Sequence, residues 1–317
     1  MVDALPLFRR YPALERIPRA GFIASPTPIE RVALASGRTL LVKRDDLCGR
    51  AIGGNKVRAL DWLLGSVGPG ESVLTVGARG STHALTTALC AGALGVTTTV
   101  VRWNQEMNEI AHRVDARTRL AARVVDARVI PFAYVLSAGY SMQRNSYWIP
   151  AGGSTPIGIL GHVNAALELA DQIAAGELEA PEVIVVPLGT GGTAAGLALG
   201  LRIAGLPTRI IGARVVPRIV GRARRVARLA NSTARVIGYV ADARVPRVSA
   251  EDIDVDDSAY GGAYGRAIAS TDDERALAAL GATLDDTYSR KAFRVAVDHA
   301  LRHRTLFWLT FDARILN

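Results

Sequence analysis

Short apolar runs alternate with helical patterns along most of the chain, and this alternation restricts the possible folds more than any other feature. The strand-like runs lie at residues 40–42, 72–76, 97–102, 183–187 and 209–215. The helical patterns lie at 55–64, 82–94, 108–125, 157–175 and 193–204. Such alternation predicts βαβ units and a mainly parallel sheet. Ligands of these sheets bind in the loops that follow the carboxyl ends of the strands, so those loops are the expected ligand sites.

Length and composition limit the class of protein. With 317 residues, of which 49% are hydrophobic, the chain can bury a substantial core in two domains or one large α/β unit. No apolar run is long enough to span a bilayer, and residues 1–19 carry charges and prolines without an apolar segment, so we expect no membrane association and no secretory signal. Cys48 and Cys90 are the only cysteines, which favours reduced thiols and a cytoplasmic location.

The formal net charge of +9 raises the question of a polyanionic partner. Nearly all of the basic residues are arginines, since Lys43, Lys56 and Lys291 are the only lysines. The densest basic cluster comprises Arg218, Arg222, Arg224, Arg225 and Arg228. Apolar residues interleave this cluster in the pattern of a solvated helix with one apolar side, and no nucleic-acid-binding module accompanies it. We therefore expect no nucleic-acid partner.

A glycine-rich loop at residues 187–196, Pro-Leu-Gly-Thr-Gly-Gly-Thr-Ala-Ala-Gly, follows one strand-like run and opens an apolar helix. Backbone amides at such a helix start suit a phosphate, although a tight turn also explains the glycines. The loop also resembles a dinucleotide fingerprint, which would require an acidic residue about twenty positions on. Arg214 ends the next strand instead, so an NADP-binding oxidoreductase with Arg214 at the 2′-phosphate is a second hypothesis.

Three further segments could carry chemistry. Lys56 follows two glycines and Asn55 at a helix start, where a buried amine becomes nucleophilic, although a surface lysine is the plainer interpretation. The turn Ser81-Thr82-His83 could bind a carboxylate or only cap a helix. Tyr264 and Tyr288 lie near glycine-rich or polar turns and could face a cleft or simply pack.

Several common chemistries lack their motif. The sequence has no G-x-S-x-G nucleophile elbow and no P-loop. His299 and His303 have helical spacing but lack the glutamate of the H-E-x-x-H motif, and two cysteines are too few for a thiolate zinc site. We therefore expect no metal site.

Taken in order, the motifs resemble those of the D-cysteine desulfhydrase and 1-aminocyclopropane-1-carboxylate deaminase family. Residues 42–47 (Val-Lys-Arg-Asp-Asp-Leu) and 53–58 (Gly-Gly-Asn-Lys-Val-Arg) resemble its K-R-D-D-L and G-G-N-K-x-R segments. Residues 149–158 resemble its I-P-x-G-G-S-N-P-x-G segment, residues 24–30 its early T-P segment, and the glycine loop its phosphate cup. The resemblance extends from about residue 20 to about residue 310.

This resemblance implies an α/β fold of the two-domain tryptophan-synthase-β type, with parallel-rich twisted sheets flanked by helices. Residues 1–50 and 160–317 would form a large domain that binds pyridoxal 5′-phosphate, and residues 51–159 a smaller α/β domain. The active site would lie in the cleft between them. The resemblance also implies a homodimer and a small amino-acid substrate.

The resemblance also assigns roles to single residues. Lys56 would hold the cofactor as a Schiff base and act as general base toward the substrate Cα proton, with Asn55 orienting the linkage. Ser81, the Thr82 amide and His83 would hold the substrate carboxylate, and Tyr264 and Tyr288 would face the substrate. Ser289, together with Thr310, would meet the pyridine nitrogen. The residues that would bind the cofactor phosphate are Gly189, Thr190, Gly191, Gly192 and Thr193.

The implied reaction is β-elimination from D-cysteine or another β-substituted alanine, giving pyruvate and ammonia. Ring-opening deamination is the alternative, against which Ser289 argues, because family deaminases tend to carry glutamate there. Thr82 replaces an asparagine expected at the cofactor's phenolic oxygen, and Leu309 and Phe311 replace residues of the family's F-W-H-T-G-G segment. These three changes motivate another hypothesis, a non-catalytic relative that keeps the fold as a binding module.

Overall fold

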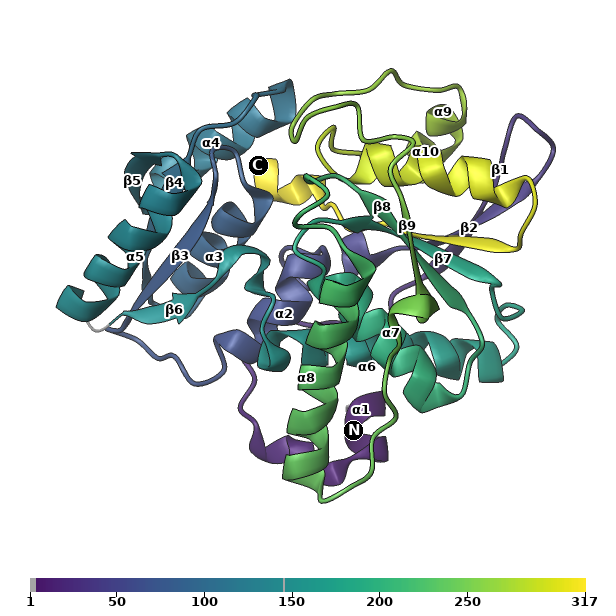
Figure 1. Ribbon diagram of the computed structural model, residues 1–317, viewed down its shortest axis with the longest axis horizontal. Coiled ribbons are helices and arrows are strands. Elements are labelled where there is room, and N and C mark those ends of the chain that lie inside the picture. Colours follow the sequence, from purple (N-terminus) through teal and green to yellow (C-terminus); the bar gives the residue numbers. More distant parts are fainter. Residues whose placement is uncertain (1–3, 145) are drawn as a thin grey trace.

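The computed structural model describes residues 4–144 and 146–317, in which the strands form two separate sheets (Figure 1). The larger sheet has the order β1-β2-β10-β7-β8-β9, and only β1 runs antiparallel to its neighbour. Its strands are β1 (Ile29–Ala33), β2 (Thr39–Lys43), β7 (Val183–Leu188), β8 (Arg209–Arg214), β9 (Ile253–Asp256) and β10 (Thr305–Trp308). The expected parallel α/β architecture is confirmed for this sheet.

The smaller sheet is entirely parallel, in the order β5-β4-β3-β6. Its strands are β3 (Ser72–Ala78), β4 (Thr97–Trp103), β5 (Arg123–Arg128) and β6 (Tyr147–Ile149). All four strands fall within the proposed smaller domain, at the left of Figure 1. The proposed boundary at residues 159 and 160 falls inside one helix, α6 (Pro156–Ala174).

Helices cover both faces of the larger sheet because successive side chains of a strand point to opposite faces. In β7, Ile184 and Val186 join a core cluster with α6, α7 (Gly192–Ala204) and α8 (Ala223–Ala241). Val183 and Val185 join a second cluster, on the face covered by α10 (Ser289–Ala300). Both faces being buried explains why β7 reads as a continuous apolar run.

The smaller sheet is covered in the same way. Val73 packs in a core cluster with α2 (Asn55–Leu63) and α3 (Thr82–Ala93), whereas Leu74 and Val76 pack toward α5 (Ile130–Arg144). The remaining helices are α1 (Pro6–Arg10), α4 (Glu109–Ala121) and α9 (Asp273–Ala278). Among the residues described, no helix is both long enough and apolar enough to cross a membrane.

Three details differ from the sequence prediction. The helix predicted at 108–125 ends at Ala121, and β5 follows because its residues add a parallel strand beside β4. The charged stretch 241–258, predicted as a loop, contains β9, an edge strand held by pairing with β8. The arginine-rich helix begins only at Ala223, so Arg218 and Arg222 precede it.

Candidate active site

A cavity of about 920 Å³ is lined by residues from both sheet regions. The strands β3, β4, β5, β7 and β8 all end in segments that line this cavity. It therefore lies beyond the carboxyl ends of parallel strands, where ligands of such sheets are expected to bind. The cavity brings together the lysine, the glycine loop, the Ser81 turn and the two tyrosines that the sequence singled out.

Lys56 enters the cavity from the first turn of α2. Gly54 precedes the helix with a φ of 88°, and a Cβ atom there would lie 2.7 Å from the Thr310 carbonyl oxygen, so only glycine fits. The Asn55 N–H donates to that same carbonyl oxygen at 3.2 Å. Burial lowers the pKa of Lys56 to about 8, and the nearby Asp285 carboxylate opposes the shift. A much larger fraction of Lys56 is therefore neutral near physiological pH than of an ordinary lysine, although the charged form still predominates.

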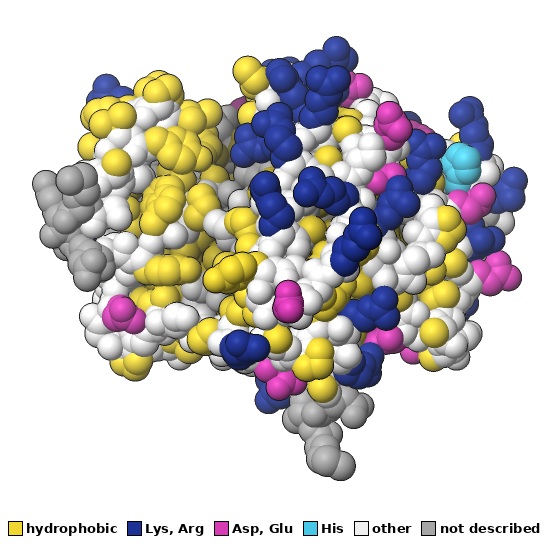
Figure 2. All heavy atoms as spheres, turned by 60° about the horizontal axis from the view of Figure 1, so that its bottom comes forward, with side chains coloured by type: hydrophobic (Ala, Val, Ile, Leu, Met, Phe, Trp, Pro, Cys, Tyr) yellow, Lys and Arg dark blue, Asp and Glu magenta, His cyan; other side chains and the backbone are white. Residues whose placement is uncertain are grey.

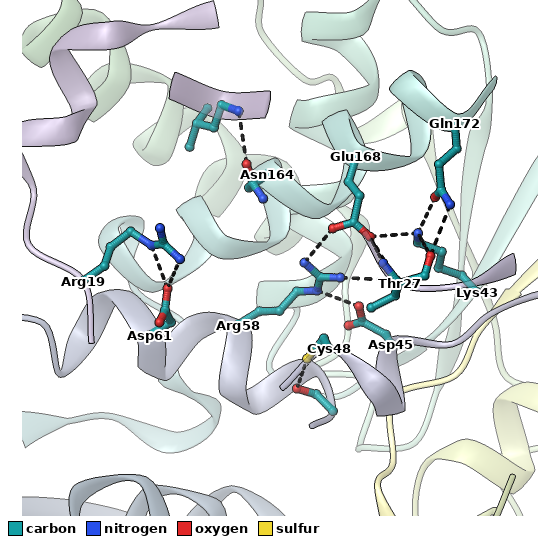
Figure 3. A network of polar contacts seen from close by, with 12 residues as sticks. Arg19, Thr27, Lys43, Asp45, Cys48, Arg58, Asp61, Asn164, Glu168 and Gln172 are labelled. Carbon is teal, nitrogen blue, oxygen red and sulfur yellow. Dashed lines mark hydrogen bonds and ion pairs between the residues drawn. The ribbon is translucent and has the colours of Figure 1, made fainter. Parts of the chain in front are cut away.

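A buried ion network anchors α2 through Arg58 (Figure 3). The Arg58 guanidinium donates to Asp45 Oδ1 at 2.6 Å and to Glu168 Oε2 at 3.2 Å. Glu168 Oε1 also accepts from Lys43 Nζ at 2.9 Å and from the Thr27 N–H at 2.6 Å. Two cations thus face two carboxylates, and Arg58 lies two residues after Lys56. The network fixes the helix that presents the reactive lysine.

The glycine loop forms a cradle at the start of α7. Gly191 has a φ of 92°, and no side chain caps the first amides of the helix. A Cβ atom on Gly192 would lie 2.7 Å from Ser154 Oγ, which leaves no room for a side chain. Thr190 Oγ1 lies 2.6 Å from Ser154 Oγ, and Thr193 Oγ1 accepts from Asn55 Nδ2 at 2.8 Å. Uncapped amides, hydroxyls and a nearby amine fit a phosphorylated aldehyde such as pyridoxal phosphate.

The Ser81 turn also lies in the cavity wall. Ser81 Oγ accepts from the Ala84 N–H at 3.4 Å, so the residue caps α3, and Thr82 is the first residue of that helix. His83 Nε2 lies 3.1 Å from Thr75 Oγ1. Burial, and next the Lys56 cation, lower the pKa of His83 to about 3, so its imidazole stays neutral. All three residues line the cavity, as a carboxylate site would require.

Tyr264 and Tyr288 pack against each other in the wall of the cavity. Their hydroxyls are hydrogen-bonded, and their rings pack edge to face with centroids 5.7 Å apart. Burial raises the pKa of Tyr264 to about 12 and raises the pKa of Tyr288 well above its usual value. Both phenols are therefore protonated at neutral pH. One hydroxyl donates to the other, which leaves one O–H free to donate to a ligand.

Asp285 is a cavity residue that the sequence reasoning missed. Its carboxylate accepts the N–H groups of Thr287, Tyr288 and Ser289 at 2.9–3.1 Å and the Ser289 hydroxyl at 2.7 Å. It thereby caps α10 and orients Tyr288. Ser289 itself is fully buried and is absent from the described cavity lining, whereas Thr310 lines the cavity. The sequence signal that could have identified Asp285 is an acidic residue shortly before a helix that begins with serine.

The replaced family positions lie in different surroundings. Leu309 is fully buried in the core beside α10 and does not contribute to the described lining, whereas Phe311 lines the cavity. Arg214, the residue on which the NADP hypothesis depended, forms an ion pair with Asp257. Within residues 4–144 and 146–317, no cluster of His, Cys, Asp and Glu side chains could hold a metal ion.

Comparisons with known proteins agree with this geometry. A family model described as "Pyridoxal-phosphate dependent enzyme" matches residues 22–288. The chain is 33% identical over 299 residues to a "Putative 1-aminocyclopropane-1-carboxylate deaminase" of Pyrococcus furiosus, covering 90% of this chain and 88% of the relative. It is 31% identical over 302 residues to a D-cysteine desulfhydrase of Salmonella choleraesuis, covering 90% and 89%. The crystal structure of an ACC deaminase homologue, 29% identical, matches with a TM-score of 0.77 over 97% of this chain and 95% of that one.

Proposed function

Because the chain belongs to the pyridoxal-phosphate-dependent enzyme family, we propose that it catalyses β-elimination from an amino acid of the D-cysteine type, giving pyruvate and ammonia. The chain is an enzyme of the tryptophan-synthase-β-like fold, and pyridoxal phosphate is its cofactor. One observation carries the proposal: a single cavity combines an amine of lowered pKa, an uncapped helix start, the Ser81-Thr82-His83 turn and a hydrogen-bonded pair of phenols.

The proposed roles follow from the chemistry of each group. When bound, the cofactor withdraws electrons from the substrate Cα and so makes its proton acidic. The residues Gly189, Thr190, Gly191, Gly192 and Thr193 hold the phosphate. Lys56 Nζ would hold the cofactor, and, once the substrate amine has displaced it, the free Nζ would take the Cα proton, for which its lowered pKa is suited.

The substrate-facing groups complete the proposed mechanism. The Ser81 hydroxyl, the Thr82 amide and the neutral His83 imidazole orient the carboxylate without adding a competing charge. The free hydroxyl of the Tyr264–Tyr288 pair donates its proton toward the group that leaves Cβ. Asp285 keeps Tyr288 in position through the backbone N–H of that residue.

Ring-opening deamination of 1-aminocyclopropane-1-carboxylate is the second candidate, because relatives carry that name. The test is a panel of D- and L-cysteine, β-substituted alanines and the cyclopropane amino acid, offered to cofactor-loaded protein. Elimination yields pyruvate, whereas ring opening yields a four-carbon 2-oxo acid. The β-elimination proposal fails if only the four-carbon product forms, and no turnover at all would favour the non-catalytic binding module.

We also propose that the enzyme works as a homodimer, as the resemblance implies, and that it lies in the cytoplasm. Cys48 and Cys90 are both buried free thiols, which agrees with a reducing compartment. Light scattering of purified protein tests the dimer, and localisation of a tagged full chain tests the compartment.

A further inference from the structure

The cavity extends beyond the catalytic groups to an apolar mouth between the two sheet regions. On the side of the smaller sheet, Val129, Ile130, Pro131 and Tyr134 line it at the junction of β5 and α5. On the opposite side the loop between β8 and α8 supplies further apolar residues, Ile219 foremost among them. In Figure 2, hydrophobic side chains gather on the left of the molecule, beside a band of Lys and Arg side chains.

Several apolar side chains of the mouth are largely exposed to solvent. Ile219 is 72% exposed, Val129 58% and Ile130 50%. Residues 129–143 contain no charged residue, although a surface helix normally presents a polar outer face. An exposed apolar patch that continues into a cavity is characteristic of a ligand-binding surface.

The size of the cavity also exceeds the need of a small substrate. The cofactor and cysteine together have about 23 non-hydrogen atoms, which require roughly 700 Å³ if each takes the share of a liquid water molecule, about 30 Å³. The cavity holds about 920 Å³. The remainder is large enough for an aromatic ring or a branched alkyl group, and the apolar mouth borders it.

We propose that the substrate carries a bulky apolar substituent on its β-sulfur or equivalent atom, and that the apolar mouth selects it. The inference rests on the proposed function and replaces the small side chain that the family resemblance implied. In the reaction, RS–CH₂–CH(NH₃⁺)–COO⁻ and water give RSH, pyruvate and ammonium. The Cα–H and Cβ–S bonds break, and the sulfur leaves with the electron pair of the Cβ–S bond and takes a proton. Cβ then gains a proton, water hydrolyses the Cα–N bond to give the keto oxygen of pyruvate and ammonium, and no oxidant or reductant is needed.

The first test compares two substrates with similar leaving groups, S-methylcysteine and S-(2-phenylethyl)cysteine, each in both enantiomers, on the holoenzyme. Removing apolar groups from a fitted pocket typically changes kcat/KM by about 10- to 200-fold per group, so we expect the phenylethyl substrate to exceed the methyl substrate by at least about tenfold. Equal or lower kcat/KM for the phenylethyl substrate would overturn the inference while leaving β-elimination intact.

A pair of matched variants locates the selection. Ile219→Asp places a charge in the mouth, and Leu120→Asp places one on α4 at a residue that is 84% exposed and absent from the described cavity lining. We expect Ile219→Asp to lower kcat/KM for the phenylethyl substrate at least about tenfold and to leave the methyl substrate within about twofold, with no effect of Leu120→Asp. Equal losses of kcat/KM for both substrates would show that the mouth serves closure of the cleft, and no loss would show that the mouth contacts neither substrate. Either outcome would overturn the inference.

A binding measurement separates the two proposals if no amino acid is turned over. Homophenylalanine and alanine cannot lose a β-substituent, and their binding is read from the change in the visible absorption of the bound cofactor. Tighter binding of homophenylalanine, weakened by Ile219→Asp, supports the apolar mouth even where elimination fails. Equal affinity for the two amino acids would overturn the inference.

Discussion

Two lysines, Lys43 at the end of β2 and Lys56 in the first turn of α2, show how surroundings decide what a lysine does. Lys43 is fully buried and donates to Glu168, to the Thr27 carbonyl oxygen and to Gln172 (Figure 3). Lys56 faces the cavity, and Asp285 is the one carboxylate among the described residues whose charge opposes the lowering of its pKa. Burial lowers the pKa of both amines, but Lys43 Nζ is engaged by Glu168 and its neighbours, whereas Lys56 Nζ faces the cavity, where its neutral form can act as a nucleophile.

Replacing the unpaired lysine should have the largest effect. Lys56→Ala removes the amine that we propose holds the cofactor, so we expect complete loss of the visible absorption band and a fall in activity of at least about 10³-fold. Absorption spectra of reconstituted protein provide the measurement. Lys291→Met is the control, because Lys291 donates to the Tyr260 and Ala263 carbonyl oxygens at 2.8 and 3.1 Å, and it should keep the band. An absorption band that survives in Lys56→Ala would show that another residue holds the cofactor.

Breaking the paired network should instead cost stability. Glu168 forms ion pairs with Lys43 and Arg58. Burial alone would raise the pKa of Glu168, but the two cations lower it to about 2. Glu168→Gln leaves both cations short of a counter-charge, and we expect a loss of about 3–5 kcal/mol in the free energy of unfolding. Urea unfolding measures this loss.

The control for this variant is an exposed carboxylate. Glu179, whose side chain is 83% exposed, pairs with Arg304, and Glu179→Gln should cost at most about 1 kcal/mol. Similar losses in the two variants would contradict the contrast between buried and exposed pairs. A folded Glu168→Gln protein should still show the cofactor band, since no ionic side chain of the network belongs to the described cavity lining.

The tyrosine pair tests the substrate side of the same cavity. Tyr264→Phe removes one hydroxyl, so the remaining phenol loses its hydrogen-bond partner and its fixed orientation. We expect kcat to fall by about 10²-fold, the usual scale of proton transfer by a positioned group, with the cofactor band retained. Steady-state kinetics beside a spectrum separate this role from that of Lys56, and an unchanged kcat would remove the pair from the mechanism.

The smallest expected effect is a pH dependence. The amine of Lys56 must be neutral to react with an aldehyde, and its pKa of about 8 lies below the usual 10.5. The rate at which cofactor-free protein captures the cofactor should rise about tenfold per pH unit below about pH 8 and level off above it. Stopped-flow absorbance measures this rate. A rise that continues to pH 10 would indicate an unperturbed lysine.

The same lowered pKa has a consequence for stability with a definite sign. Between about pH 8 and pH 10.5 the Lys56 amine holds a proton in the unfolded chain but not in the folded one. Stability of the cofactor-free protein should therefore rise with pH across this window, and Lys56→Met should remove that part of the slope.

Particular residues show how much of the site and fold could be predicted from the sequence. The glycine loop and the Ser81 turn were found because each follows a strand-like run, and parallel strands end at the same edge of a sheet. Lys56 was found because it follows two glycines and an asparagine at a helix start. Asp285 was missed because its role depends on where its carboxylate lies relative to α10 and the cavity. β5 was absorbed into a predicted helix because an edge strand is specified by its neighbour β4 rather than by its own periodicity.

The sequence by itself determined the parallel α/β architecture and the order of the motifs, because hydrophobic periodicity and glycine-rich turns act locally. The tertiary structure alone decided which lysine is paired. Lys43 and Glu168 are 125 residues apart in the chain, and only the packing of β2 against α6 brings their charges to 2.9 Å. It also decided that residues from both sheet regions form one apolar mouth, since no local pattern relates Ile130 to Ile219.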